Sequence, residues 1–225
     1  DPVVADAYRE VVQRARQRRH GHDTQFADLL AESLRQGAEG VIGVEDVLTQ
    51  VVEPMARVAP VLLVVVDGMS AGVAAELADG VAARSWTEMV HGDGRQPVLA
   101  ALPTVTRYSR TSLCCAALRD GGQADEKAAF GSSFPGARLF HKVDLRAPAG
   151  EELAPVVRDA IQSLDRVVAV VLNTVDDALA KADPGGTDWT VEAIQHLPAL
   201  LDLAAQVGRV VILTSDHGHV VERGS

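Results

Sequence analysis

The chain has 225 residues and a formal net charge of −10, from 31 acidic residues against 21 Lys and Arg. Hydrophobic residues make up 47% of it, which is enough for one large α/β domain and excludes a disordered chain. The acidic balance argues against a free-standing surface for non-specific DNA binding, because such surfaces need clustered cations. A nucleic-acid substrate stays open, since a bound metal or a local basic patch reverses the sign where it matters.

The cysteines and the terminus indicate a compartment. Cys114 and Cys115 are adjacent, which predicts no disulfide framework and favours a reducing environment. The N-terminus shows no basic region followed by an apolar core, and no apolar run reaches the roughly 18–20 residues of a membrane span. We therefore expect a soluble, cytoplasmic protein without membrane contact.

Residues 1–59 predict an N-terminal helical segment. We expect helices over residues 4–18 and 24–34, separated by a turn at residues 19–22 that contains Gly21. Asp23 and Thr24 then cap the second helix. Residues 40–58 form a third amphipathic stretch, with apolar side chains at helical spacing.

The sequence pattern of residues 60–225 predicts an α/β core. Three runs of β-branched and aliphatic residues read as strands buried on both faces. Their alternation with helical stretches predicts a doubly wound, mainly parallel sheet flanked by helices. In chain order we expect strands within the stretches 61–70, 167–177 and 210–220, each as an apolar run of five or six residues, and short strands over 98–102 and 138–141. We expect helices over 71–83, 111–118, 150–164 and 188–207, and a mobile Gly- and Ser-rich loop over 121–133.

The three buried runs lead into aspartates: Asp67, Asp176 and Asp216. Ligands collect outside the carboxyl ends of parallel strands, so we expect these carboxylates to lie close together. Carboxylates that close raise one another's pKa, and a divalent cation relieves the repulsion. His217 follows Asp216, and mixed carboxylate and imidazole ligation suits Zn²⁺ or Mn²⁺ better than Ca²⁺. The alternative is that the aspartates only cap the helices that follow.

Hydroxyl side chains crowd the turn after Leu102, at residues 103–110. A Thr or Ser at a helix N-terminus lies where backbone N–H groups and the helix dipole favour a phosphate. Beside a divalent cation, such a hydroxyl loses its proton more readily and attacks phosphorus. Taken alone, the turn is more typical of a Thr-rich helix cap, and the three acidic strand ends turn the balance toward a nucleophile.

The order of these motifs resembles the alkaline phosphatase superfamily. Within it, Asp-Gly-Met-Ser at 67–70, Leu-Phe-His-Lys at 139–142 and Thr-Ser-Asp-His-Gly-His at 214–219 resemble the PglZ domain of BREX-type phage-defence systems. The resemblance covers roughly Val61 to the C-terminus. It implies an alkaline phosphatase-like core over residues 60–225 and a phosphoesterase-like activity.

The resemblance also implies a set of site residues. In the superfamily one metal is held by the first Asp, the nucleophile and the Asp-His pair, which correspond here to Asp67, Thr106, Asp216 and His217. Thr106 is the second Thr of the Pro-Thr-x-Thr turn, the position of the superfamily nucleophile. We therefore expect one complete site for a divalent metal, Zn or Mn.

The resemblance implies only part of a second metal site. Asp176 matches its acid, but Ala180 stands where the superfamily has His, and no distal His follows. The missing ligand is expected from Asp177, Asp183 or His219, or from a part of the protein outside this chain, whose core we expect to be truncated at the C-terminus.

Five further side chains are candidates for substrate-binding or auxiliary roles. His141 and Lys142 follow a short strand and either contact phosphate oxygens, orient a carboxylate or lie on the surface. Arg107 and Arg110 flank Thr106 and either neutralise a phosphodiester or form a solvated helix face. His219, two residues beyond His217, is a candidate ligand or proton-transfer group.

Two functions follow from these expectations. The first is metal-dependent hydrolysis of a phosphodiester through a metal-activated Thr106, with DNA among the candidate substrates. The second is a catalytically impaired metal-binding module within a multi-protein defence complex. The family resemblance implies other phage-defence proteins as partners, such as a methyltransferase.

Overall fold

The computed structural model describes residues 2–36, 40–90, 92, 94–163, 165–180 and 188–220. The chain divides into two compact units, Asp1–Val41 and Ile42–Ser225. Residues 42–59, grouped by the sequence with the N-terminal segment, belong to the second unit. The reason is packing: Val44, Leu48 and Val52 are buried in its core.

The described residues of the first unit form one helix, α1 (Pro2–Gln36), where the sequence predicted two. The expected turn at residues 19–22 is helical instead. Thr24 Oγ1 donates to the His20 carbonyl at 3.0 Å, and Arg19 pairs with Asp23 at 3.8 Å across the expected break. One internal glycine, Gly21, costs a helix only about 1 kcal/mol relative to Ala, which is too little to end it.

The second unit is built on four parallel strands in the order β4-β5-β2-β6, which confirms the predicted parallel α/β architecture. Unbroken runs of Val and Leu bury both faces of the central strands, as parallel sheets require. The strands are β2 (Val61–Val66), β4 (Arg138–Phe140), β5 (Val167–Leu172) and β6 (Val210–Thr214). A separate parallel pair joins β1 (Ile42–Gly43) and β3 (Val98–Leu99).

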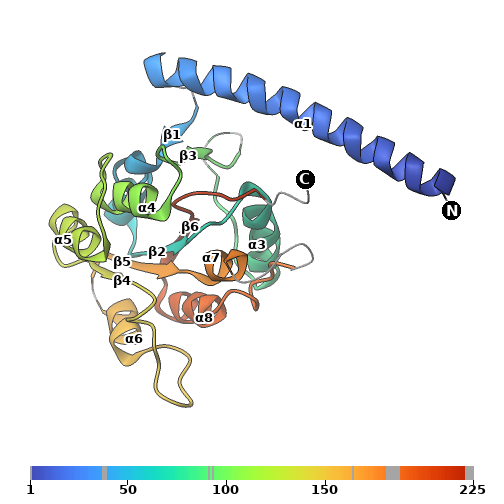
Figure 1. Ribbon diagram of the computed structural model, residues 1–225. Helices are drawn as coiled ribbons and strands as arrows, with labels where there is room; N and C mark the ends of the chain where they lie inside the picture. Colours follow the sequence, from blue (N-terminus) through green and yellow to red (C-terminus); the bar gives the residue numbers. More distant parts are fainter. Residues whose placement is uncertain are drawn as a thin grey trace. The chain divides into compact units, whose positions relative to one another are not determined.

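Helices cover both faces of the sheet (Figure 1). One face packs against α3 (Ala71–Ala83), α6 (Pro155–Gln162) and α8 (Leu197–Val207). The other packs against η1 (Val44–Asp46), η2 (Leu48–Val52), α2 (Glu53–Val58), α4 (Thr106–Cys115) and α5 (Gln123–Ser133).

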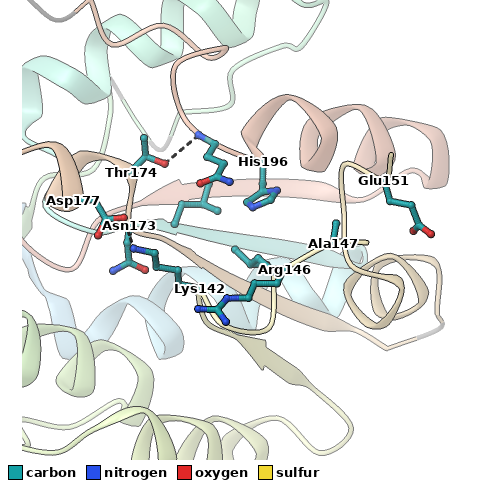
Figure 2. A pocket seen from close by; sticks show the side chains of 11 residues that line it. Lys142, Arg146, Ala147, Glu151, Asn173, Thr174, Asp177 and His196 are labelled. Carbon is teal, nitrogen blue, oxygen red and sulfur yellow. Dashed lines mark hydrogen bonds and ion pairs between the residues drawn. The ribbon is translucent and has the colours of Figure 1, made fainter. Parts of the chain in front are cut away.

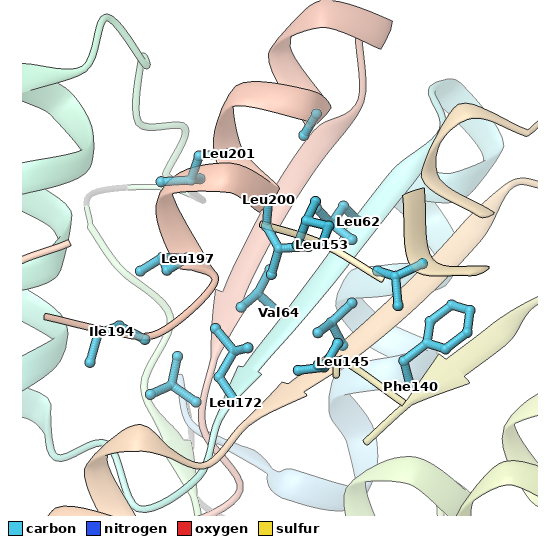
Figure 3. Packing of buried hydrophobic residues seen from close by; sticks show 14 of the residues in the cluster. Leu62, Val64, Phe140, Leu145, Leu153, Leu172, Ile194, Leu197, Leu200 and Leu201 are labelled. Atoms are coloured by element: carbon cyan, nitrogen blue, oxygen red, sulfur yellow. The ribbon is translucent and has the colours of Figure 1, made fainter. Parts of the chain in front are cut away.

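Alternation along β2 decides which side chain enters which core layer. Leu62 and Val64 face the α8 layer, where Leu197 and Leu200 pack over them (Figure 3). Leu63 belongs to the opposite layer. These side chains are fully buried, and each contributes about 1.5–3 kcal/mol of burial free energy.

Several predicted elements differ in the structure, besides β3 and α6, which are shorter than the strand expected over 98–102 and the helix expected over 150–164. The expected loop 121–133 is mostly helix α5, because Glu126 and Phe130 are buried on one face and the Asp125 carboxylate accepts the Gly122 N–H at 3.0 Å. The helix expected from Thr111 begins earlier, at Thr106. The last helix, expected from residue 188, begins at Leu197. None of the described helices combines the length and apolar character that crossing a bilayer requires.

Candidate active site

The acidic strand ends of β2 and β6 meet at one edge of the sheet. The two strands are adjacent and parallel, with Val65 opposite Thr214, so Asp67 and the Asp216–His217 pair emerge side by side. One ligand atom from each of Asp67, Asp216 and His217 lies within 4.8 Å of the other two. In the described part of the chain, this is the group of acidic and histidine side chains close enough to hold a metal ion.

Asp67 is fully buried and accepts three hydrogen bonds. Its Oδ2 atom accepts from Arg110 Nη1 at 2.9 Å and from Asn173 Nδ2 at 2.6 Å, while Oδ1 accepts from Thr106 Oγ1 at 3.3 Å. Burial and the nearby charge of Asp216 raise the pKa of Asp67 to about 7, although Arg110 opposes the shift. A site with this much unrelieved negative charge favours a cation.

Asp216 offers an oxygen that has no partner. Its Oδ1 atom accepts the N–H groups of Gly68 at 3.3 Å and His217 at 3.0 Å, but Oδ2 is buried without a hydrogen bond among the described residues. Burial raises the pKa of this carboxyl as well. Buried polar atoms are almost always satisfied, so a free carboxylate oxygen beside Asp67 fits the coordination of a divalent cation.

His217 presents the nitrogen that a metal would need. Its Nδ1 lies 3.1 Å from the Gly218 carbonyl, a contact that places a hydrogen on Nδ1, so that the lone pair of the neutral ring is on Nε2. Nε2 lies 3.5 Å from Asp67 Oδ1 and 3.7 Å from Asp216 Oδ2. Two carboxylates and one imidazole are a donor set that suits Zn²⁺ or Mn²⁺ and leaves positions open for a substrate.

Thr106 is the first residue of α4 and points into this cluster. Its Oγ1 lies 2.9 Å from His217 Nε2 as well as 3.3 Å from Asp67 Oδ1. No side chain caps α4 within the described residues. The Tyr108 N–H donates to the Val105 carbonyl at 2.9 Å, which leaves the N–H groups of Thr106 and Arg107 available to an anion. Thr104, the other threonine of the turn, is exposed.

Ser109 fixes the position of α4. This buried hydroxyl donates to the Asp216 carbonyl at 2.5 Å and accepts the Ala101 N–H at 3.1 Å. It thereby ties the helix that carries Thr106 to the loop that carries Asp216. The sequence contains no motif that singles out Ser109, and its role follows only from its burial and its hydrogen bonds in the structure.

A buried ion network lies behind Asp67. Arg110 Nε donates to both oxygens of Glu126 at 3.3 Å, and His141 Nε2 lies 2.5 Å from Glu126 Oε2. Thr111 Oγ1 adds a bond to Glu126 at 3.1 Å. Burial alone would raise the pKa of Glu126, but the His141 hydrogen bond and the Arg110 charge lower it. Sequence reasoning missed Glu126 because it assigned residues 121–133 to a loop.

The network changes the interpretation of two candidates. His141 is 1% exposed and faces Glu126, so it orients a carboxylate and does not reach the surface of the site. Arg110 is buried between Glu126 and Asp67. Its place is a structural one beneath the cluster, and the solvated helix face that the sequence also allowed is excluded for it.

Asp176 and His219 flank Gly68 at the border of the cluster. Asp176 lies in the first turn of α7 (Thr174–Leu179), and a Cβ built on Gly68 would lie 3.6 Å from the Asp176 Cβ. His219 Nδ1 lies 2.6 Å from the Gly68 carbonyl. The structure does not bring Asp176 into the three-residue group, although its charge contributes to the raised pKa of Asp67. Asp183 lies outside the described residues.

The two remaining candidates pair with neighbouring acids. Lys142 Nζ contacts Asp177 Oδ2 at 2.5 Å, and Arg107 contacts Asp120. The Arg107 side chain is 74% exposed. Within the described residues, neither cation contacts the cluster of Asp67, Asp216 and His217, which we call the Asp67 cluster. Both side chains lie on the surface around it.

Comparison with known proteins identifies one family. A family model described as the BREX system PglZ alkaline phosphatase-like domain matches residues 47–225, which is most of the chain. A search of curated proteins found no match.

Proposed function

This chain belongs to the PglZ family of alkaline phosphatase-like domains of BREX systems, and on that premise we propose that it hydrolyses phosphodiesters through Thr106 with the help of a divalent metal. The observation that carries the proposal is the place of the Thr106 hydroxyl, 3.3 Å from Asp67 Oδ1 and 2.9 Å from His217 Nε2. A hydroxyl so close to the candidate ligands suits a nucleophile.

Asp67, Asp216 and His217 would hold the metal, through Asp67 Oδ1, the unpartnered Asp216 Oδ2 and His217 Nε2. A bound divalent cation lowers the pKa of a neighbouring hydroxyl and withdraws charge from phosphoryl oxygens. Arg110 and Asn173 hold the other oxygen of Asp67, so that Oδ1 stays turned toward Thr106. Gly218 keeps the hydrogen of His217 on Nδ1.

The chain's own residues then account for the transfer. Thr106 Oγ1 gives up its proton and attacks phosphorus, and the bond from phosphorus to the leaving oxygen breaks as the bond to Thr106 forms, with that oxygen taking up a proton to leave as an alcohol. The first turn of α4 holds the phosphoryl charge with the N–H groups of Thr106 and Arg107 and with the positive end of its dipole. Water then cleaves the Thr106 phosphoester and restores the hydroxyl.

Asp176 and His219 are proposed as the protein's contribution to a second metal position. Both lie beside Gly68, next to the first ligands. Ala180 takes the place of a superfamily His and has no donor atom, so this position is incomplete and is expected to bind metal weakly. Two-metal phosphoryl transfer depends on cations about 4 Å apart, and a weak second position would lower the rate.

The incomplete position supports a second candidate function. A module with one metal and no second cation could serve a multi-protein defence complex without turnover, with a methyltransferase or DNA among its proposed partners. The two functions differ in one measurable property: only the first gives metal-dependent hydrolysis that requires Thr106.

The test is hydrolysis of bis(4-nitrophenyl) phosphate with added Zn²⁺ or Mn²⁺. We expect Thr106→Ala to lower kcat by about a thousandfold or more, the scale seen when a nucleophile is removed, and Thr106→Ser to keep measurable activity. The matched control is Thr104→Ala, an exposed hydroxyl two residues away, which should be as active as the parent. Equal activity of Thr106→Ala and the parent would exclude Thr106 as the nucleophile.

A further inference from the structure

A polar cleft lies beside the candidate metal centre, on the same edge of the sheet. Lys142, just after β4, and Asn173, just after β5, line a cavity of about 550 Å³ together with residues just before α8 (Figure 2). In the order β4-β5-β2-β6, the cleft occupies the β4–β5 half of the edge. The Asp67 cluster occupies the β2–β6 half.

Asn173 contacts the candidate metal centre and also lines the cleft. Its Nδ2 donates to Asp67 Oδ2 at 2.6 Å, and the same residue lines the cleft. A substrate whose reacting phosphate lies at Thr106 therefore reaches the cleft by passing Asn173. A substrate longer than one phosphate group would therefore extend along this edge of the sheet into the cleft.

The charges of the cleft leave one cation uncompensated. Both lining carboxylates already have partners: Asp177 pairs with Lys142 at 2.5 Å, and Glu151 pairs with Arg158 at 3.0 Å. Arg146 also lines the cleft, is exposed, and has no ion pair with any residue the structure describes. Its planar guanidinium presents the paired N–H donors that bind a phosphate through two oxygens.

The rest of the lining suits the remainder of a nucleotide. Leu145 and Leu172 are buried residues of the core that form an apolar wall, and the His196 ring faces the same space as Arg146 (Figure 2). The Glu152 carbonyl lies 2.9 Å from His196 Nδ1 and fixes the ring. Imidazole rings are among the platforms on which bases stack, and the cavity volume lies in the usual range for ligand sites.

We propose that this cleft binds the nucleotide unit next to the scissile phosphodiester, with the phosphate of that unit on Arg146. The inference rests on the proposed function and adds a substrate class to it: a nucleotide strand with at least two phosphates, in preference to a small ester with one. Arg146 is a substrate-binding residue in this account, and Asn173 connects its subsite to Asp67.

The experiment measures binding without turnover. Thr106→Ala protein loaded with Mn²⁺ is titrated by calorimetry with dithymidine monophosphate carrying, or lacking, a 5′-phosphate. We expect the additional phosphate to tighten binding about tenfold or more, the scale of one hydrogen bond to a charged group. Adding Arg146→Gln should remove that difference. The matched control Arg57→Gln, an exposed arginine on α2 at the opposite end of β2, should keep it.

The outcomes separate the cleft from the chemistry. A 5′-phosphate effect that survives Arg146→Gln overturns the cleft assignment, whether or not the chain hydrolyses phosphodiesters. An effect that depends on Arg146 in a protein whose intact Thr106 form hydrolyses nothing supports the cleft and contradicts the proposed function. Circular dichroism of each variant identifies loss of fold, which an exposed Arg→Gln change should not cause.

Discussion

Asp67 lies between opposing charges, with Arg110 on one oxygen and Asp216 and Asp176 near enough to raise its pKa. Burial contributes most to that rise, because a charged carboxylate loses its hydration inside the protein. The same residue directly follows a fully buried strand, β2. An acid in such a position destabilises the fold unless a proton or a cation accompanies it, which explains why the site suits a metal.

The pH dependence of the metal-free chain tests this account of Asp67. Its pKa of about 7 exceeds the ordinary value of 3.8, so the folded state holds the proton more tightly than the unfolded state. The stabilising contribution is complete below about pH 4 and is lost as pH rises toward 7. We expect Asp67→Asn, which does not titrate, to gain stability relative to the parent across this window.

Urea unfolding of both proteins in the presence of a chelator, at several pH values, gives the difference in free energy directly. Asp216 shifts in the same direction and its charge acts on Asp67, so the difference reports the titration of this pair, from which Asp67→Asn removes one member. A difference that stays constant from pH 4 to 7 would show that Asp67 titrates normally.

At the residue scale, the sequence predicted those site residues that stand in short, recognisable motifs. Asp67, Thr106, Asp216 and His217 stand in short motifs at strand ends and a helix start, and the fold brings them together. Glu126 was not predictable from its neighbours, because a Gly- and Ser-rich composition obscured a one-sided helix. Its partners Arg110 and His141 lie 16 and 15 residues away, a relation that a single sequence does not reveal.

Among the elements, α4, α5 and β4 are joined by Glu126. The carboxylate comes from α5, Arg110 and Thr111 from α4, and His141 from the end of β4. Because Arg110 also donates to Asp67, the network fixes α5 relative to the candidate metal centre. The orientation of α4, and with it Thr106, depends on this buried contact.

Glu126→Ala should therefore be strongly destabilising. Removing one partner of a buried ion network leaves Arg110 and His141 unpaired and costs about 3–5 kcal/mol. Urea unfolding measures the loss. The control is Glu53→Ala, which removes an exposed ion pair with Arg57 at 2.7 Å and should cost no more than about 1 kcal/mol. A Glu126→Ala loss as small as that of the control would mean that the network is not a stabilising one.

Element boundaries were predictable where burial patterns are continuous. The strands β2 and β5 are six-residue runs with every residue buried, and helix α3 begins after Ser70, whose Oγ accepts the Val73 N–H. The starts of α4 and α8 were not predicted, because no capping side chain precedes Thr106 or Leu197 to mark the first turn of the helix in the sequence.

For the whole molecule, the division into two units makes a separate prediction. Residues 42–225 contain the sheet, its helices and all the candidate site residues, and nearly all of this range matches the family model. The side chains described along α1 are almost all exposed. We propose that the second unit folds and binds metal on its own.

Residues 42–225 expressed alone should melt cooperatively by circular dichroism, at a temperature within a few degrees of the full chain. Added Zn²⁺ or Mn²⁺ should raise that temperature, because a ligand that binds only the folded state stabilises it. A non-cooperative melt would show instead that residues 1–41 are needed for the fold.

The fold class was predictable at this scale because three Val-rich runs at α/β spacing admit few other architectures. The boundary of the N-terminal unit was not, since Val44, Leu48 and Val52 have helical spacing whether or not they pack on a sheet. A sequence period identifies an apolar face, but only the tertiary structure identifies its partner.

Calorimetric titration of the metal-free chain with Zn²⁺, compared with Asp216→Asn, tests the central claim most directly. Asp216→Asn keeps the size of the side chain and removes the charge of the oxygen that lacks a partner. We predict one tight site per chain and a loss of affinity of about a hundredfold or more in the variant, the scale of removing a charged partner from a buried site. Equal affinity in the two proteins, or no binding to the parent, would contradict a metal centre at Asp67, Asp216 and His217.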